Sequence, residues 1–214
     1  MKQGKTLSMV QLALLTALIV MLSFIPYIGY IKIPVLAVQA TTIHIPVIVG
    51  SILLGPKAGG FLGFVFGLTS LINNTTQPGL TAFCFSPFIS MGEGLGGSPL
   101  ALIVCFLPRI LTGVVPYYVY RGLQKLDKKE GPGKLSLLFA GVAGSMTNTI
   151  LVMGMIYLFF GSAYAAARGI AYEAVLGVIL SVVGINGTIE AVVAALLAGA
   201  ICLAVMKANV LKTK

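Results

Sequence analysis

Arg109 is the residue of this sequence whose chemistry is hardest to explain by packing, because it lies in the middle of an apolar run from Pro99 to Tyr120. A fixed cation in hydrocarbon costs about 3 kcal/mol on insertion scales, so the side chain is expected to face protein or water and to have a polar partner. A planar guanidinium forms two parallel hydrogen bonds with a carboxylate. Two interpretations follow: Arg109 binds an acidic ligand inside a membrane, or it pairs with Glu190 and ties two helices together.

Other polar side chains are expected at a similar depth. At a rise of about 1.5 Å per residue, Arg109, His44, Thr69 and Asn148 lie about 16 to 20 Å from the inner end of their helices, and Glu190 about 5 Å higher. They are therefore expected to share one cavity, beneath connections whose amides and aromatic rings suit a small molecule with polar and apolar parts. The candidate substrate-binding residues are Arg109, His44, Asn148, Asn73, Asn74, Gln77, Phe83, Phe85, Tyr164 and Glu190.

The elements that must position these residues are membrane helices. With 58% hydrophobic and 9% charged residues, the chain is suited to hydrocarbon, and its 214 residues provide about six spans of roughly 20 residues each. We predict an all-α integral membrane protein with one six-helix domain over residues 1–214. The predicted helices cover residues 8–27, 42–54, 58–71, 99–120, 135–160 and 186–206.

Long connections are predicted over residues 26–41, 72–98 and 161–185, whereas Gly55 and Pro56 make a tight turn between the second and third helices. Lysine and arginine accumulate on the cytoplasmic side of membrane proteins. With the N-terminus inside, only Lys32 and Arg168 fall on the outer side, against eleven basic residues on the inner side. Both termini are therefore predicted to be cytoplasmic in the cell membrane, with the long connections outside. The inner basic residues are Lys2, Lys5, Lys57, Arg121, Lys125, Lys128, Lys129, Lys134, Lys207, Lys212 and Lys214.

The sequence offers little for an enzyme. Its cysteines, Cys84, Cys105 and Cys202, are widely spaced and lack histidine companions, so neither a disulfide framework nor a metal site is indicated. The single histidine, His44, has no catalytic triad or metal-ligand pattern around it, and is either a packed core residue or part of the binding site. No nucleotide-binding motif is present, so we predict no internal ATP-driven motor. No catalytic constellation is found either, so we predict no catalytic residue and no cofactor. We predict no nucleic-acid partner, because the net charge of +9 serves topology and contact with anionic lipid headgroups.

Small residues at intervals of four allow membrane helices to approach closely. Gly59, Gly63 and Gly67 form one such stripe, which we expect to pack against a neighbouring helix. Ala13 and Ala17 form another on the first helix, where internal packing and docking of a partner are both open.

Taken together, these segments resemble the substrate-binding S components of energy-coupling factor (ECF) vitamin transporters. The resemblance extends over essentially the whole chain and is closest to the pantothenate-specific branch. The matching segments are residues 13–17 (ALLTA), 41–50 (TTIHIPVIVG), 54–59 (LGPKAG), 63–70 (GFVFGLTS), 108–113 (PRILTG), 147–149 (TNT) and 186–190 (NGTIE).

This resemblance implies a subunit that binds a vitamin from outside and then docks on a shared module, made of a membrane scaffold subunit and two ATPases. It also implies that Ala13 and Ala17 contact that module. Pantothenate, with its carboxylate, amide and hydroxyls, suits an arginine and several amides. The alternatives are an S component for folate, a pyridoxine-type vitamin or a thiamine precursor, and a self-sufficient small facilitator.

Overall fold

The structure is a computed structural model that describes residues 2–25, 29–33, 38–90, 97–126 and 133–212. A helix, a β-hairpin and two further helices come first. They are α1 (Lys2–Phe24), β1 (Tyr30–Ile33), β2 (Val38–Thr41), α2 (His44–Leu54) and α3 (Pro56–Thr76). The remaining elements within the described residues are helices, including a 3₁₀ turn and a π-helical segment. Its elements are η1 (Ala82–Cys84), α4 (Leu100–Leu126), α5 (Lys134–Arg168), α6 (Tyr172–Val182), η2 (Val183–Gly187) and α7 (Thr188–Lys212).

The helices bear out a multi-pass membrane protein. Within the described residues, four helical stretches are long and apolar enough to cross a membrane: Lys5–Phe24, Leu100–Gln124, Lys134–Arg168 and Tyr172–Ala208. The short helix α2 rises only about 16 Å, against a hydrocarbon core of about 30 Å. Six spans therefore stay a prediction.

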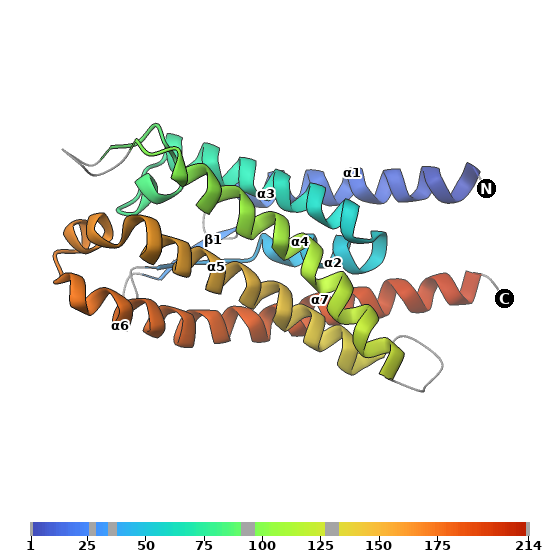
Figure 1. Ribbon diagram of the computed structural model, residues 1–214. Coiled ribbons are helices and arrows are strands. Elements are labelled where there is room, and N and C mark those ends of the chain that lie inside the picture. The colour runs from blue at the N-terminus through green and yellow to red at the C-terminus, as the bar shows by residue number, and fades with distance from the viewer. Residues whose placement is uncertain (1, 26–28, 34–37, 91–96, 127–132, 213–214) are drawn as a thin grey trace.

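Both ends of the described chain lie at the same end of the bundle, as Figure 1 shows, together with the turn between α2 and α3. The connection from α3 to α4 and the turn from α5 to α6 lie at the opposite end. This grouping matches the one expected from the basic residues, although Lys128, Lys129 and Lys214 lie outside the described residues. The cytoplasmic assignment of the end that holds both termini stays a prediction.

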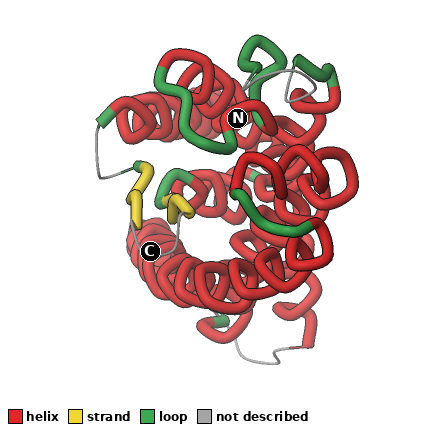
Figure 2. The backbone as a smooth tube through the Cα atoms, turned by 90° about the vertical axis from the view of Figure 1, so that its left-hand side faces the viewer, coloured by secondary structure: helices red, strands yellow, loops and turns green. Residues whose placement is uncertain are grey.

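The β-hairpin occupies the connection predicted after the first helix. Its strands pair antiparallel, with Tyr30 opposite Thr41 and Ile33 opposite Val38. Non-helical backbone at membrane depth is tolerated where it is buried in protein or lines a cavity. Figure 2 shows the two strands close to the helices when the bundle is viewed end-on from the side opposite the termini.

The predicted connection over residues 161–185 is wrong. Helix α5 continues to Arg168 because residues 162–167 include four alanines, the best helix formers, and it ends at Gly169 with φ 65° in the left-handed region. Helix α6 begins at Tyr172 and runs through η2 into α7, so the last helical stretch is much longer than the predicted 186–206. Similarly, α3 extends to Thr76, into the connection predicted over residues 72–98.

The glycine stripe of α3 packs against α4, as expected. A Cβ atom built on Gly59 would lie 1.9 Å from the carbonyl oxygen of Gly113, and one on Gly63 would lie 2.2 Å from that of Arg109. Side chains at these positions would collide with the backbone of α4, so only glycine permits this approach. The contact fixes the backbone of α4 at Arg109 itself.

Candidate functional site

A cavity of about 190 Å³ is bordered by the end of β2, by residues of α3, α4, α5, α6, η2 and α7, and by described residues of the connection that follows α3. Polar and apolar groups both face it. Its polar lining residues are Thr41, Ser70, Asn74, Thr81, Arg109, Asn148, Thr149, Tyr164, Arg168, Asn186 and Glu190. The remaining lining residues are Phe66, Gly79, Leu80, Phe85, Val152, Met153, Ile156 and Val182.

Arg109 is 94% buried at the wall of this cavity, with its guanidinium held on three sides. The carbon of the guanidinium lies 5.0 Å from the ring centre of Phe85 and 5.6 Å from that of Phe66. Its Nη1 donates a hydrogen bond of 2.8 Å to the carbonyl oxygen of Val104. In a regular helix that oxygen would accept from residue 108, but Pro108 has no N–H. The proline therefore frees the acceptor that orients Arg109.

Three residues that line the cavity carry buried polar atoms without a hydrogen-bond partner among the described residues. They are Arg109 through Nε, Asn148 through Oδ1, and Asn186 through both side-chain atoms. Leaving a buried donor or acceptor unpaired costs about 1 to 3 kcal/mol, so native proteins satisfy nearly all of them. Several unpaired groups around one cavity indicate a surface built to hydrogen-bond a ligand.

Glu190, in contrast, has a partner for each carboxylate oxygen. One accepts a 2.7 Å hydrogen bond from the backbone N–H of Thr41, and the other a 3.1 Å bond from the hydroxyl of Thr149. No ion pair joins Glu190 to Arg109 in the part of the chain that the structure describes. Glu190 therefore ties the end of the β-hairpin to α5 and α7, while still lining the cavity.

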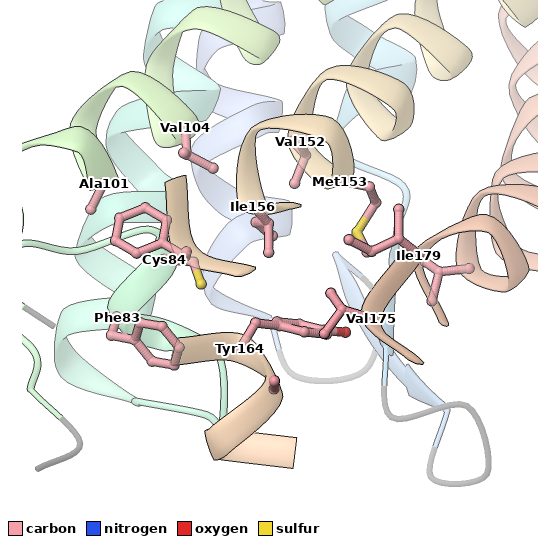
Figure 3. Close-up of a cluster of buried hydrophobic side chains, with 13 residues drawn as sticks. Phe83, Cys84, Ala101, Val104, Val152, Met153, Ile156, Tyr164, Val175 and Ile179 are labelled. Carbon is pink, nitrogen blue, oxygen red and sulfur yellow. The ribbon is translucent and has the colours of Figure 1, made fainter. Parts of the chain in front are cut away.

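One wall of the cavity is apolar and belongs to a buried cluster around α5 and α6. Val152, Met153, Ile156 and Tyr164 of α5 belong to this cluster, and Figure 3 shows Met153 and Tyr164 next to Ile179 and Val175 of α6. A ligand with both branched apolar and polar parts fits a cavity with these two kinds of wall.

A second arginine at the cavity was not among the predicted site residues. Arg168 donates from Nε and Nη2 to the hydroxyl of Tyr164, at 3.2 and 2.8 Å, and its guanidinium lies 5.2 Å from the Tyr164 ring centre. The sequence indicates only an outer positive charge at Arg168, within the connection predicted over residues 161–185. Because α5 is longer than predicted, Arg168 and Tyr164 stand one turn apart on a rigid helix and line the cavity.

The structure brings six of the ten predicted residues to the cavity: Arg109, Asn148, Asn74, Phe85, Tyr164 and Glu190. The other four, and Thr69, lie elsewhere. His44 is buried at the first turn of α2 without a partner for Nε2 among the described residues, and Phe83 packs edge-on against Phe160. Thr69 accepts a hydrogen bond from Ser23, whereas Asn73 and Gln77 lie at the end of α3 outside the lining.

Asn186 and Thr149 are lining residues that the site prediction omitted. The signal was available, because both belong to polar segments inside otherwise apolar stretches, at residues 147–149 and 186–190. What the sequence does not reveal is that Asn186 sits on a π-helical turn.

The outer face of α1 carries the two alanines singled out from the sequence. Ile19 and Ser23 are buried against the bundle, whereas Ala13 and Ala17 are exposed. Only 11% of the apolar stretch of α1 is buried. Ala13 and Ala17 are therefore not packed against other described helices of the isolated chain.

No group of three or more His, Cys, Asp or Glu side chains able to hold a metal ion occurs within the described residues. Cys84, Cys105 and Cys202 are all buried as free thiols.

Comparison with known proteins identifies related sequences. Residues 7–202 match the family described as "ECF transporter, substrate-specific component". The pantothenic acid transporter PanT of Lactococcus lactis subsp. cremoris is 38% identical over 210 residues, covering 98% of both chains. The pantothenate transporter PanT of Leuconostoc mesenteroides is 28% identical over 203 residues, covering 94% of this chain and 93% of the relative. A match of this extent shows that the chain belongs to the family of substrate-specific components of ECF transporters.

Proposed function

We propose that this protein captures pantothenate from outside the cell membrane and delivers it inward after docking on an ECF module. The observation that carries the proposal is Arg109, a 94% buried cation at the cavity wall whose Nε has no hydrogen-bond partner among the described residues. A carboxylate is the natural complement of a guanidinium in such a place. The relatives named for pantothenate transport supply the identity of that acid.

The formal charge of the cavity supports a monoanionic ligand. Arg109 and Arg168 supply two positive charges, and Glu190 supplies one negative charge that already has two protein donors. Pantothenate carries a single carboxylate, and its branched dimethyl group suits the apolar wall formed by Val152, Met153 and Ile156.

The cavity is proposed to open to the outside. Gly79, Leu80, Thr81 and Arg168 line it from the end of the bundle opposite both termini. With the termini assigned to the cytoplasm by the basic residues, that end faces outward. Six crossings of one domain over residues 1–214 are part of this proposal, with α2 and the β-hairpin together forming one of them.

Transport requires a partner, because a binding subunit without a nucleotide site cannot use ATP. The proposed partner is a module of one membrane scaffold subunit and two ATPases, approaching the exposed face of α1 at Ala13 and Ala17. Small side chains there allow a partner helix to approach the backbone closely.

The test is direct binding followed by reconstitution. The detergent-solubilised protein should bind pantothenate in a calorimetric titration and reject folate, pyridoxine and thiamine precursors. In liposomes it should accumulate pantothenate only with an ECF module and ATP. Binding of a different vitamin in place of pantothenate would refute the ligand, and uptake by the protein alone would show a self-sufficient facilitator.

A further inference from the structure

We propose that Asn186 is a specificity-determining residue that recognises the hydroxyl and the adjacent carbonyl of the ligand's pantoyl half, while Arg109 binds the carboxylate at the other end. This inference rests on the proposed function, and it assigns the side chain of Asn186 to one hydroxyl–carbonyl pair of the ligand. It is carried by the π-helical turn of η2, by the burial of Asn186 and by the unpaired state of its amide.

The π-helical turn places Asn186 in line with two other lining residues. Val182, Asn186 and Glu190 all line the cavity, at intervals of four residues along one continuous helical stretch. In a regular α-helix, two such steps drift around the axis by about 80°, because each residue turns about 100°. A π-helical turn holds more residues, so η2 reduces this drift and keeps the three positions facing the same cavity.

The amide of Asn186 is buried and has both hydrogen-bonding atoms free. The residue is 4% exposed, and neither Nδ2 nor Oδ1 has a partner among the described residues. Reversing the assignment of the nitrogen and oxygen leaves this finding unchanged, because both atoms are unpaired. The helix holds Asn186 close to α5, since a Cβ atom on the next residue, Gly187, would lie 3.2 Å from Cγ2 of Thr149.

A side-chain amide offers one donor and one acceptor on the same edge. The complementary ligand edge is an acceptor beside a donor, which is what a carbonyl oxygen and a neighbouring hydroxyl provide. Pantothenate has this pair where its hydroxyl-bearing carbon adjoins the amide carbonyl. A carboxylate offers acceptors only and would leave Oδ1 of Asn186 unpaired, so that end of the ligand belongs to Arg109.

The experiment compares two ligands on the wild-type protein and on Asn186→Ala, by calorimetric titration in detergent. One ligand is pantothenate, and the other is its analogue without the hydroxyl next to the amide carbonyl. The wild-type protein should bind the analogue about tenfold or more weakly, because a buried polar group then stays unpaired. Asn186→Ala should bind pantothenate about tenfold to a hundredfold more weakly, and should no longer distinguish the two ligands.

Stability separates recognition from a structural role. Because the amide has no protein partner among the described residues, the melting temperature of ligand-free Asn186→Ala should match the wild type, whereas pantothenate should raise it less. Ser181→Ala, an exposed polar residue on α6 outside the cavity, is the matched control and should bind both ligands like the wild type.

Retained discrimination in Asn186→Ala would overturn the assignment, and so would a ligand-free protein that melts early or does not fold, because the amide would then serve the fold. Failure of the wild-type protein to bind pantothenate would instead refute the proposed function. The two failures are therefore distinguishable.

Discussion

Arg109 donates a hydrogen bond from Nη1 to the carbonyl oxygen of Val104, on the preceding part of its own helix, at 2.8 Å. The side chain thus turns back along α4, and its Nε has no hydrogen-bond partner among the described residues. The acceptor exists because Pro108 cannot donate to it. The backbone hydrogen bond that Pro108 cannot form is thus replaced by one from the side chain of Arg109, the next residue.

Replacing Pro108 with alanine should weaken pantothenate binding without destabilising the protein. The new N–H of residue 108 would compete with Arg109 for the Val104 oxygen. A proline inside a helix costs about 3 kcal/mol when nothing replaces the lost hydrogen bond, so its removal should not lower stability. We expect a several-fold loss of affinity in calorimetric titration, with an equal or higher melting temperature.

Pro116→Ala provides the control for this effect, because Pro116 also interrupts α4 but, unlike Pro108, is not adjacent to a residue that lines the cavity. Pro116 packs near Gly144 of α5, so this variant should change stability and keep the affinity. Equal losses of affinity in both variants would refute the coupling between Pro108 and Arg109.

Arg109→Lys should weaken pantothenate binding about 10- to 150-fold. A compact ammonium cannot reproduce the two parallel hydrogen bonds of a guanidinium, and losing one charge-assisted hydrogen bond costs about 1.5 to 3 kcal/mol. Titration beside a melting curve is the measurement. A lower melting temperature with wild-type affinity would assign Arg109 to the fold and remove it from ligand binding.

Glu190→Gln should loosen the β-hairpin. The carboxylate accepts from both Thr41 and Thr149, whereas an amide has a single acceptor oxygen and would face one donor with its own NH₂ group. We expect the free energy of unfolding to fall by about 1 to 3 kcal/mol and the backbone amide of Thr41 to exchange faster with deuterium. Thr149→Val removes only the hydrogen bond from the Thr149 hydroxyl to Glu190, so the Thr41 amide should exchange at the wild-type rate. Unchanged exchange in Glu190→Gln would show that the hairpin is held by other contacts.

Ala13→Trp should abolish uptake and preserve pantothenate binding by the isolated protein. Ala13 is exposed on α1 and does not line the cavity, so a bulky ring there obstructs only an approaching partner helix. The measurements are uptake in liposomes containing an ECF module and titration of the isolated protein. Leu196→Trp, at a 60% exposed position of α7, is the control and should transport normally. Normal uptake by Ala13→Trp, or loss of its binding, would refute docking at α1.

Cysteine labelling tests the orientation. On a background without Cys84, Cys105 and Cys202, single cysteines at the exposed residues Gln77 and Ala171 should react with an impermeant reagent in sealed cells. A cysteine at the exposed Lys57, in the turn at the end that holds both termini, should react only after the membrane is permeabilised. Labelling of the Lys57 position in sealed cells would invert the assignment and direct the cavity inward.

Three features were determined by the sequence alone: the membrane environment, the glycine stripe that packs two helices together, and the buried arginine. A chain with 58% hydrophobic residues has few ways to satisfy its backbone except helices in a membrane. Glycines four residues apart must lie on one helix face, and the stripe at Gly59 and Gly63 does meet α4. Arg109 was identifiable because an isolated charge in an apolar run needs a polar environment.

Only the tertiary structure decided which polar residues meet around the cavity. Depth along a helix is readable from sequence, but rotation about the helix axis depends on packing, so His44 and Thr69 lie away from the cavity while Asn148 lines it. The π-helical turn changes that rotation at Asn186, and the added turns of α5 bring Arg168 to the site. A one-dimensional pattern gives the period of a regular helix; it does not give the local departures from that period which tertiary contacts stabilise.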